Sequence, residues 1–196
     1  MTCKITKVKR IKTYEIDGVQ YKSSTFVKYH KEFREAVDNN VIHSFTLPNN
    51  GVDKSESKYK NNNGAIIDDK HFDSIMEARF YLLLCKLKKD NQIKNFDCQV
   101  KFELQEGYYN VFKAKKIQPI NYIADFVIIL NNNIKVVIDV KGIKTADFKL
   151  KEKMFGYKYP ELCFMCVQWR AKTNSWEILD DIEKERRAKK RNNKEN

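Results

Sequence analysis

Two aspartates and a lysine occupy positions where the sequence otherwise predicts buried β-strands. Asp125 interrupts the apolar run Tyr122–Leu130, and Asp139 and Lys141 belong to the run Ile134–Gly142. Since side chains alternate along a strand, Asp139 and Lys141 are expected on one face. Charged groups on central strands are costly to bury, so they either pair with one another or bind a metal ion. The pattern alone leaves both open: a structural salt bridge or a metal-dependent site.

The elements around these residues predict a mixed sheet. The two runs are separated by Asn131, Asn132 and Asn133, which predicts a tight hairpin turn. A further strand is predicted over Gln99–Gln105, a helix over Asp147–Tyr159 before Pro160, and a buried strand over Leu162–Trp169. With a helix at the start, the order indicates an α/β fold in which helices flank the sheet.

Glu77 adds a third acid, on the leading helix. Ser74 and Glu77 have the spacing of a capping box, in which the glutamate serves only to cap the helix. Glu77 also lies at the edge of the predicted apolar stripe, from which it could point toward the two aspartates. The sequence leaves both roles open. The stripe consists of Met76, Phe80, Leu83, Leu84 and Leu87.

These residues together resemble the PD-(D/E)XK nuclease superfamily, most closely its small phage-encoded members. Asp125 matches the first acid, and Glu77 matches the glutamate of the leading helix. Ala124 stands where the family name implies a proline. The resemblance extends over about Ile67–Trp169. Its motif segments are S-x-x-E-A at Ser74–Ala78, Y-x-A-D-F at Tyr122–Phe126, and D-V-K-G at Asp139–Gly142, which contains the acid-x-Lys element Asp139-Val140-Lys141.

The resemblance implies a restriction-endonuclease-like mixed central sheet, and hydrolysis of DNA phosphodiester bonds with Mg²⁺ or Mn²⁺. It implies a phage or mobile-element enzyme, either site-specific in the manner of homing enzymes or directed at branched DNA. Asp125, Asp139, the carbonyl of Val140 and Glu77 are the implied metal ligands, and Mg²⁺ prefers such oxygen ligands. Lys141 is implied to orient the attacking water and to stabilise charge on the phosphate.

The charge of the chain favours a polyanionic partner. The formal net charge is +12 and the sequence pI is about 9.4, which is typical of nucleic-acid-binding proteins. A non-catalytic DNA-binding protein with a nuclease fold and an RNA-directed nuclease are the alternatives. Cutting both DNA strands would need two sites, which a homodimer would supply. The residues expected to contact DNA, rather than merely to form solvated helix faces, are Lys144, Lys149, Lys151, Lys153, Lys28 and Arg34.

The N-terminal half contains a weak repeat. Ile16–Phe45 and Ile67–Phe96 align without a gap, and each predicts an extended piece, a serine start, a helix, an asparagine stop and an extended exit. We expect a small basic α+β module over residues 1–50, which either binds DNA or packs on the rest. A polar linker over 51–66, a nuclease domain over 67–180 and a flexible basic tail over 181–196 would follow.

The sequence gives no sign of a secreted or membrane protein. Five cysteines at irregular spacing argue against a disulfide framework. The basic N-terminus lacks a following apolar segment, and no apolar run is long enough to span a bilayer. We therefore expect a cytoplasmic protein, in the host cell if it is phage-encoded. The Cys163–Cys166 pair is expected to be core rather than a zinc site, because no second pair completes it.

Overall fold

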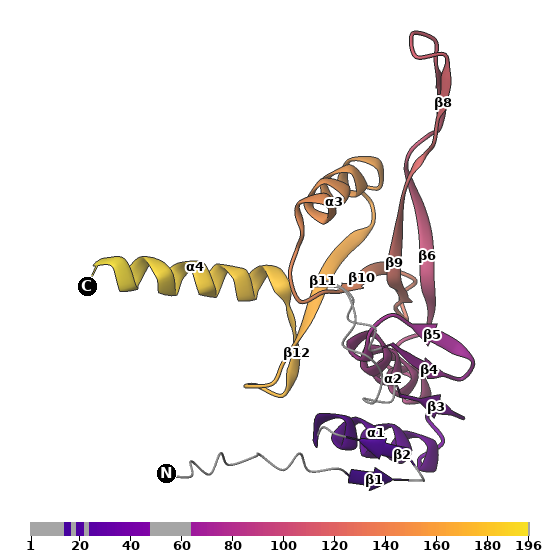
Figure 1. Cartoon of the computed structure of the whole chain (residues 1–196), viewed down its shortest axis with the longest axis vertical. Coiled ribbons are helices and arrows are strands. Elements are labelled where there is room, and N and C mark those ends of the chain that lie inside the picture. The colour runs from indigo at the N-terminus through magenta and orange to yellow at the C-terminus, as the bar shows by residue number, and fades with distance from the viewer. Residues whose placement is uncertain (1–13, 17–18, 22–23, 48–63, 196) are drawn as a thin grey trace, which may run out of the picture. The chain divides into compact units, whose positions relative to one another are not determined.

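The computed structural model describes residues 14–16, 19–21, 24–47 and 64–195 of the chain (Figure 1). The chain divides into two compact units, Met1–Cys85 and Lys86–Asn196, and each is described by itself. In the described part, no helix is long and apolar enough to cross a membrane.

In its described residues, the first unit has two short antiparallel sheets and two helices. Strands β1 and β2 form a hairpin, and β3, β4 and β5 form a three-stranded antiparallel sheet in that order. Helix α1 follows β2, and helix α2 follows β5 and runs on past the end of the unit. The bounds are β1 Tyr14–Ile16, β2 Val19–Tyr21, α1 Ser24–Asp38, β3 Phe45–Thr46, β4 Ala65–Ile67, β5 Lys70–Phe72 and α2 Ile75–Lys89.

The predicted repeat is present in the secondary structure. Strands β4 and β5 and helix α2 lie 51 residues after β1, β2 and α1 respectively, with the same bounds in each copy. Both helices end at an asparagine in the left-handed region, Asn40 with φ 56° and Asn91 with φ 55°. The next residue in each copy bonds back to a carbonyl five positions earlier, Val41 to Ala36 and Gln92 to Leu87, as in a Schellman C-cap.

The division between the units does not fall at the polar segment 51–66, most of which lies outside the described residues. Strand β3 before this segment pairs with β4 after it, with Phe45 opposite Ile67. Arg79 of α2 forms a 2.9 Å ion pair with Glu32 of α1. Strand pairing and this ion pair therefore join the two copies of the repeat in one unit, which the polarity of the segment could not indicate.

The second unit is a five-stranded mixed sheet with two helices. The strand order is β12-β11-β10-β9-β6, in which β10 and β11 are parallel and the other neighbours antiparallel. Helix α3 connects the parallel pair, and α4 follows β12. This confirms the expected α/β class. The bounds are β6 Asn95–Gln105, β9 Ile120–Ile129, β10 Lys135–Val140, α3 Ala146–Lys158, β11 Cys163–Arg170, β12 Ser175–Ile178 and α4 Leu179–Glu195.

An aromatic core fixes α3 against the sheet. Phe148 and Phe155 of α3 are buried, and the ring centroid of Phe155 lies 5.1 Å from that of Phe164 and 5.9 Å from that of Tyr122. Thr145 begins the helix by accepting a hydrogen bond from the Phe148 N–H. These contacts place α3 over the face of the sheet that carries Tyr122.

Two parts of this unit differ from the sequence-based expectation. The C-terminal segment, expected as a flexible tail, forms α4, whose first turn buries Leu179 and Ile182. An i,i+4 ion pair between Arg187 and Glu183, 2.9 Å long, adds support. In addition, β6 and β9 continue beyond the sheet into a hairpin of β7 (Tyr108–Asn110) and β8 (Lys115–Ile117), which projects at the top of Figure 1.

Candidate active site

Two carboxylates and an ammonium group meet where β9 and β10 stop pairing. The last registered pair is Phe126 opposite Ile138, and Asp125 and Asp139 are the next residues on each strand. The Lys141 Nζ lies 3.1 Å from Oδ2 of Asp139 and 3.9 Å from Oδ2 of Asp125. The structure therefore brings together three of the four residues that the sequence singled out.

Asp125 is positioned by the backbone of the neighbouring strand. Its Oδ2 accepts a 2.7 Å hydrogen bond from the N–H of Val140, and the residue is buried. On the other side of β9, strand β6 pairs with Phe126 and Ala124 but not with Asp125 between them. The residue of β6 opposite Asp125 is Gln99, whose φ is 52°. The Asp125 carboxylate thus accepts a hydrogen bond from a backbone N–H at the point where the regular pairing of β9 with β10 has ended. This hydrogen bond from β10 fixes its orientation.

Asp139 is the most buried of the three charged groups, at 1% exposure. Its Oδ1 accepts a 2.5 Å hydrogen bond from the hydroxyl of Tyr122. Burial raises the pKa of Tyr122, and the negative charge of Asp139 and this hydrogen bond raise it further, so the phenol remains a donor. The buried Oδ2 accepts no hydrogen bond from the described residues, although the Lys141 ammonium lies beside it.

Lys141 connects the buried carboxylates with solvent. Its side chain is 36% exposed, and Nζ lies 6.0 Å from the ring centroid of Phe148. The salt bridge that was expected as the alternative to a metal site is present between Lys141 and Asp139, but its lysine side is open to solvent. A ligand can therefore approach the Lys141 ammonium from the solvent.

Cys166 lies beside Asp139 on β11 and is buried. Burial raises the pKa of its thiol to about 12, against a smaller lowering by Lys144. The thiol is therefore neutral at physiological pH and does not act as a thiolate ligand. Cys163 is exposed and, three positions away in a strand, faces the other side of the sheet, so the two cysteines do not form a ligand pair.

Gln168 is a candidate site residue that the sequence did not reveal. It is two positions after Cys166. The last registered pair of β10 and β11 is Val140 with Val167, and Lys141 and Gln168 are the next residues on each strand. Its buried Oε1 has no hydrogen-bond partner among the described residues. The signal available in the sequence was a single amide in the otherwise apolar run Leu162–Trp169.

Glu77 belongs to the first unit, at the start of α2. Its Oε1 accepts a 2.8 Å hydrogen bond from the Ser74 hydroxyl, which in turn accepts one from the Glu77 N–H at 3.1 Å. The capping role expected from the spacing is therefore present. Glu77 is 7% exposed, which is unusual for a glutamate whose only task is to cap a helix.

The donor set of the second unit fits a hard divalent cation. Among the described residues, no three His, Cys, Asp or Glu side chains gather as a metal-binding group. Mg²⁺ keeps several waters and is commonly bound by one or two carboxylates together with substrate phosphates. Asp125 and Asp139 provide two carboxylates, and Oδ2 of Asp139 is an oxygen without a hydrogen bond from the described residues.

Five of the six basic residues expected at DNA are accessible to different degrees. Lys149 and Lys153 are exposed on α3, whereas Lys151 is half-buried and pairs with Asp147 at 3.1 Å. Lys28 and Arg34 are exposed on α1 of the first unit.

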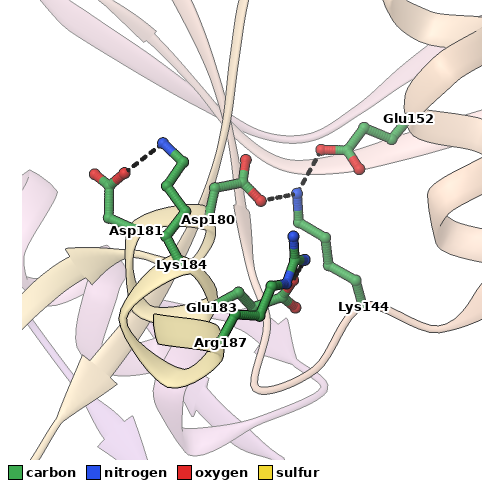
Figure 2. Close-up of polar contacts among 7 residues, drawn as sticks. All are labelled: Lys144, Glu152, Asp180, Asp181, Glu183, Lys184 and Arg187. Atoms are coloured by element: carbon green, nitrogen blue, oxygen red, sulfur yellow. Dashed lines mark hydrogen bonds and ion pairs between the residues drawn. The ribbon is translucent and has the colours of Figure 1, made fainter. Parts of the chain in front are cut away.

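The sixth, Lys144, is buried at 8% exposure (Figure 2). Its Nζ lies 2.6 Å from both Glu152 Oε1 and Asp180 Oδ1. Burial lowers the pKa of Lys144, but the hydrogen bonds to Asp180 and Glu152 outweigh it and raise the pKa overall. The expectation of a phosphate contact is corrected, because two carboxylates take up this ammonium, which ties the loop after β10 to α3 and α4.

Comparison with known proteins gives one match. A family model described as "Protein of unknown function (DUF1064)" matches residues 56–176, which include β9, β10, α3 and β11. No curated protein matches the chain. No solved structure matches it either. Since the match extends over more than half of the sequence, the chain belongs to the DUF1064 family.

Proposed function

We propose that this protein is a metal-dependent nuclease that hydrolyses phosphodiester bonds in DNA. The observation that carries the proposal is the convergence of Asp125, Asp139 and Lys141 where β9 and β10 stop pairing. Burying two carboxylates for stability alone is unfavourable, since an apolar pair of similar volume is often as stable. A function that requires both charges explains why they are there.

Each side chain has a task in this proposal. Asp125 and Asp139 hold the metal ion, and the carbonyl of Val140 is a further oxygen ligand. Mg²⁺, when bound, supplies Lewis acidity and a more acidic water. The Val140 N–H and the Tyr122 hydroxyl fix the two carboxylates, each through one oxygen. Such supporting hydrogen bonds orient ligands and tune a metal site.

Lys141 acts on the phosphate and the water. Hydrolysis forms a bond from the water oxygen to phosphorus, breaks one phosphorus–oxygen ester bond, and leaves a hydroxyl and a phosphate monoester. The half-exposed ammonium is able to orient the water and to stabilise negative charge on the phosphoryl oxygens. Gln168, which follows the last registered pair of β10 and β11 as Lys141 does, is a second candidate for contact with the scissile phosphate.

The other proposed site residues lie on helices and not on the two active-site strands. Glu77 is proposed as an additional ligand from the sequence resemblance and from its burial. Lys149 and Lys153 are proposed to hold the DNA backbone because they are exposed on α3, which follows the active-site strand. The formal charge of +12 supports a polyanionic substrate.

One observation favours a second candidate, a DNA-binding protein without activity. The Lys141 ammonium forms a 3.1 Å ion pair with Asp139, an arrangement that neutralises both groups without a metal. In that case the site is a stabilising pair and the basic charge serves only binding. The two candidates differ in one measurable property, the cutting of DNA in the presence of a divalent ion.

The deciding experiment incubates the purified chain with supercoiled, linear and branched DNA in Mg²⁺, Mn²⁺ or EDTA. The nuclease proposal expects nicks or breaks that require the metal and disappear in Asp139→Asn. Absence of metal-dependent cutting on every DNA, together with retained DNA binding, would establish the second candidate. Parallel reactions with duplex and single-stranded RNA test whether the substrate is DNA and not RNA.

A further inference from the structure

The hairpin of β7 and β8, with the turn between them, forms an arm over Gly107–Ile117. No residue of the arm is buried. Phe112, in the turn, is 101% exposed, and Val111 beside it is 77% exposed. An isolated two-stranded hairpin is at best marginally stable in water, and a contiguous group of exposed apolar side chains marks an interaction site. The arm therefore adds nothing to the core and displays its apolar tip to a partner.

The arm nevertheless has a defined shape. Tyr108 pairs with Ile117, Tyr109 with Lys116, and Asn110 with Lys115. The turn is closed by a 2.9 Å hydrogen bond from the Lys113 N–H to the Asn110 side chain, and Ala114 adopts a φ of 44°. At the base, a Cβ on Gly107 would lie 3.1 Å from the Ile117 carbonyl, so glycine lets the two strands approach closely. The tip is thus held by a ribbon continuous with β6 and β9 (Figure 1).

The charge of the arm identifies the class of partner. Its eleven residues include three lysines and no acidic residue. Each face carries a tyrosine and a lysine: Tyr109 and Lys116 on one, Tyr108 and Lys115 on the other. A ribbon lying flat on a protein or membrane would need one apolar face only, whereas a ribbon inside a groove is contacted on both. Aromatic and basic residues together on both faces fit a nucleic acid.

We propose that the arm enters a groove of duplex DNA, with Phe112 against the bases and the three lysines on the phosphates. The major groove of B-form DNA, ~12 Å wide, admits a two-stranded ribbon, whereas the deep, narrow major groove of duplex RNA does not. In the major groove an apolar side chain at the tip is able to contact base edges, such as the thymine methyl group. This deepens the proposed function, on which it rests for DNA as the substrate.

The length of the ribbon sets where this contact falls. From Asp125 to Phe112 there are thirteen residues along the chain, which span at most ~43 Å at a strand rise of ~3.3 Å. This is about one helical turn of DNA, ~34–36 Å. The arm therefore contacts the duplex within about one turn of the bond that is cut.

The test measures binding of the full chain to a fluorescent duplex of ~40 base pairs, about four turns, by anisotropy in EDTA, where no cutting occurs. Phe112→Ala is expected to weaken binding about 10- to 150-fold, the fold-change that corresponds to burying one phenylalanine side chain. Replacing Lys113, Lys115 and Lys116 by alanine should reduce the slope of log K against log salt by about 2–3, since each phosphate contributes ~0.9. Duplex RNA should compete poorly.

The controls are exposed residues outside the arm. Ile134→Ala removes an exposed apolar side chain in the β9–β10 turn. Lys135→Ala with Lys172→Ala removes exposed lysines at the start of β10 and in the β11–β12 turn. These variants should bind as the wild type does. Because Phe112 makes no buried contact, circular dichroism and the melting temperature of Phe112→Ala should be unchanged.

Three outcomes are decisive. If arm variants bind DNA as tightly as the wild type while the wild type cuts it in Mg²⁺, the arm proposal is overturned and the nuclease proposal stands. If arm variants lose affinity but the wild type cuts nothing, the arm proposal stands and the nuclease proposal is overturned. If Phe112→Ala turns a dimer into a monomer in sedimentation with unchanged affinity, the arm binds a second copy of the chain, which also overturns the proposal.

Discussion

Asp125 Oδ2 accepts a hydrogen bond from the backbone N–H of Val140, the residue between Asp139 and Lys141. One carboxylate of the candidate site is therefore tied to the strand that carries the other two groups. A small shift of β10 would move all three together, so their mutual geometry is preserved. This coupling also decides which substitutions test chemistry rather than folding.

Asp125→Asn retains the oxygen that accepts from Val140 and removes only the charge. We expect cutting to fall at least about 10³-fold, because a neutral amide is a poor Mg²⁺ ligand, with the fold and DNA affinity nearly unchanged. Asp139→Asn should behave alike. Plasmid cutting and anisotropy in EDTA measure the two properties, and Asp97→Asn, an exposed acid on β6, is the matched control. Full cutting by both variants would remove the assignment of the site.

Tyr122→Phe tests a positioning residue. It removes the hydroxyl that donates to Asp139 and leaves the aromatic packing against Phe155 intact. Loss of such a supporting hydrogen bond typically costs 10- to 100-fold in metal affinity or activity. We expect cutting to require more Mg²⁺, with a smaller effect at saturation.

The control is Tyr159→Phe, whose hydroxyl donates to the Glu103 carbonyl at 3.0 Å. It should leave the Mg²⁺ dependence unaltered. An equal change of stability in both variants with no change in Mg²⁺ dependence would assign Tyr122 to structure alone.

Lys141→Ala separates the two roles of the site. Removing the ammonium takes away the group that competes with a cation for Asp139 Oδ2, so the affinity for Mn²⁺ should be equal or higher. Cutting should nevertheless fall about 10²- to 10³-fold, since a donor to the phosphate is lost. Mn²⁺ binding followed by electron paramagnetic resonance and cutting rates give the two numbers. Lys158→Ala, with similar exposure and a pair to Glu103, is the control.

The chemistry-bearing strands were predictable because their signal is local. Charged residues within strongly apolar runs and an asparagine turn identified β9 and β10, and alternation placed Asp139 and Lys141 together. The helix α3 and its end before Pro160 followed from equally local signals. The equal spacing of two ββα units was visible as a weak repeat, since the same caps and turns recur.

What could not be predicted depends on long-range contacts. Tyr122 begins the Y-x-A-D-F segment, but nothing in the sequence indicated that its hydroxyl donates to Asp139, 17 residues further along the chain. Gln168 required the parallel register of β10 with β11. The same holds for Lys144, because its two partners are 8 and 36 residues further along the chain. Residues of the arm escaped notice because their strands are only three residues long.

Gln168→Leu tests whether the amide takes part in the reaction. Its buried Oε1 has no partner in the described part of the chain, so an apolar side chain of similar size should keep or slightly raise the melting temperature. We expect cutting to fall about 10-fold if the amide contacts the scissile phosphate, with DNA affinity preserved. Gln168→Glu should fall further, because a negative charge would face the phosphate. Unchanged rates in both variants would remove Gln168 from the site.

Lys144→Met tests the buried ion pairs that replaced the expected phosphate contact. Glu152 and Asp180 are partly exposed, at 28% and 53%, so water compensates part of their lost partner. We expect a loss of about 1–3 kcal/mol in the free energy of unfolding, below the ~3–5 kcal/mol typical of a fully buried pair. DNA affinity should not change at a temperature where the variant is folded.

The pH dependence of this loss has a definite sign. The pKa of Lys144 is raised in the folded chain above its ordinary value of 10.5, so its contribution is fully present below that value and is lost as the pH rises through the folded pKa. The difference between wild type and variant, measured by urea unfolding, should be constant from pH 7 to about 10 and shrink above. Lys149→Met on α3, which is exposed, should show the opposite pattern, unchanged stability with weaker DNA binding. A Lys144→Met variant that is fully stable but binds DNA poorly would restore the phosphate contact and refute the structural role.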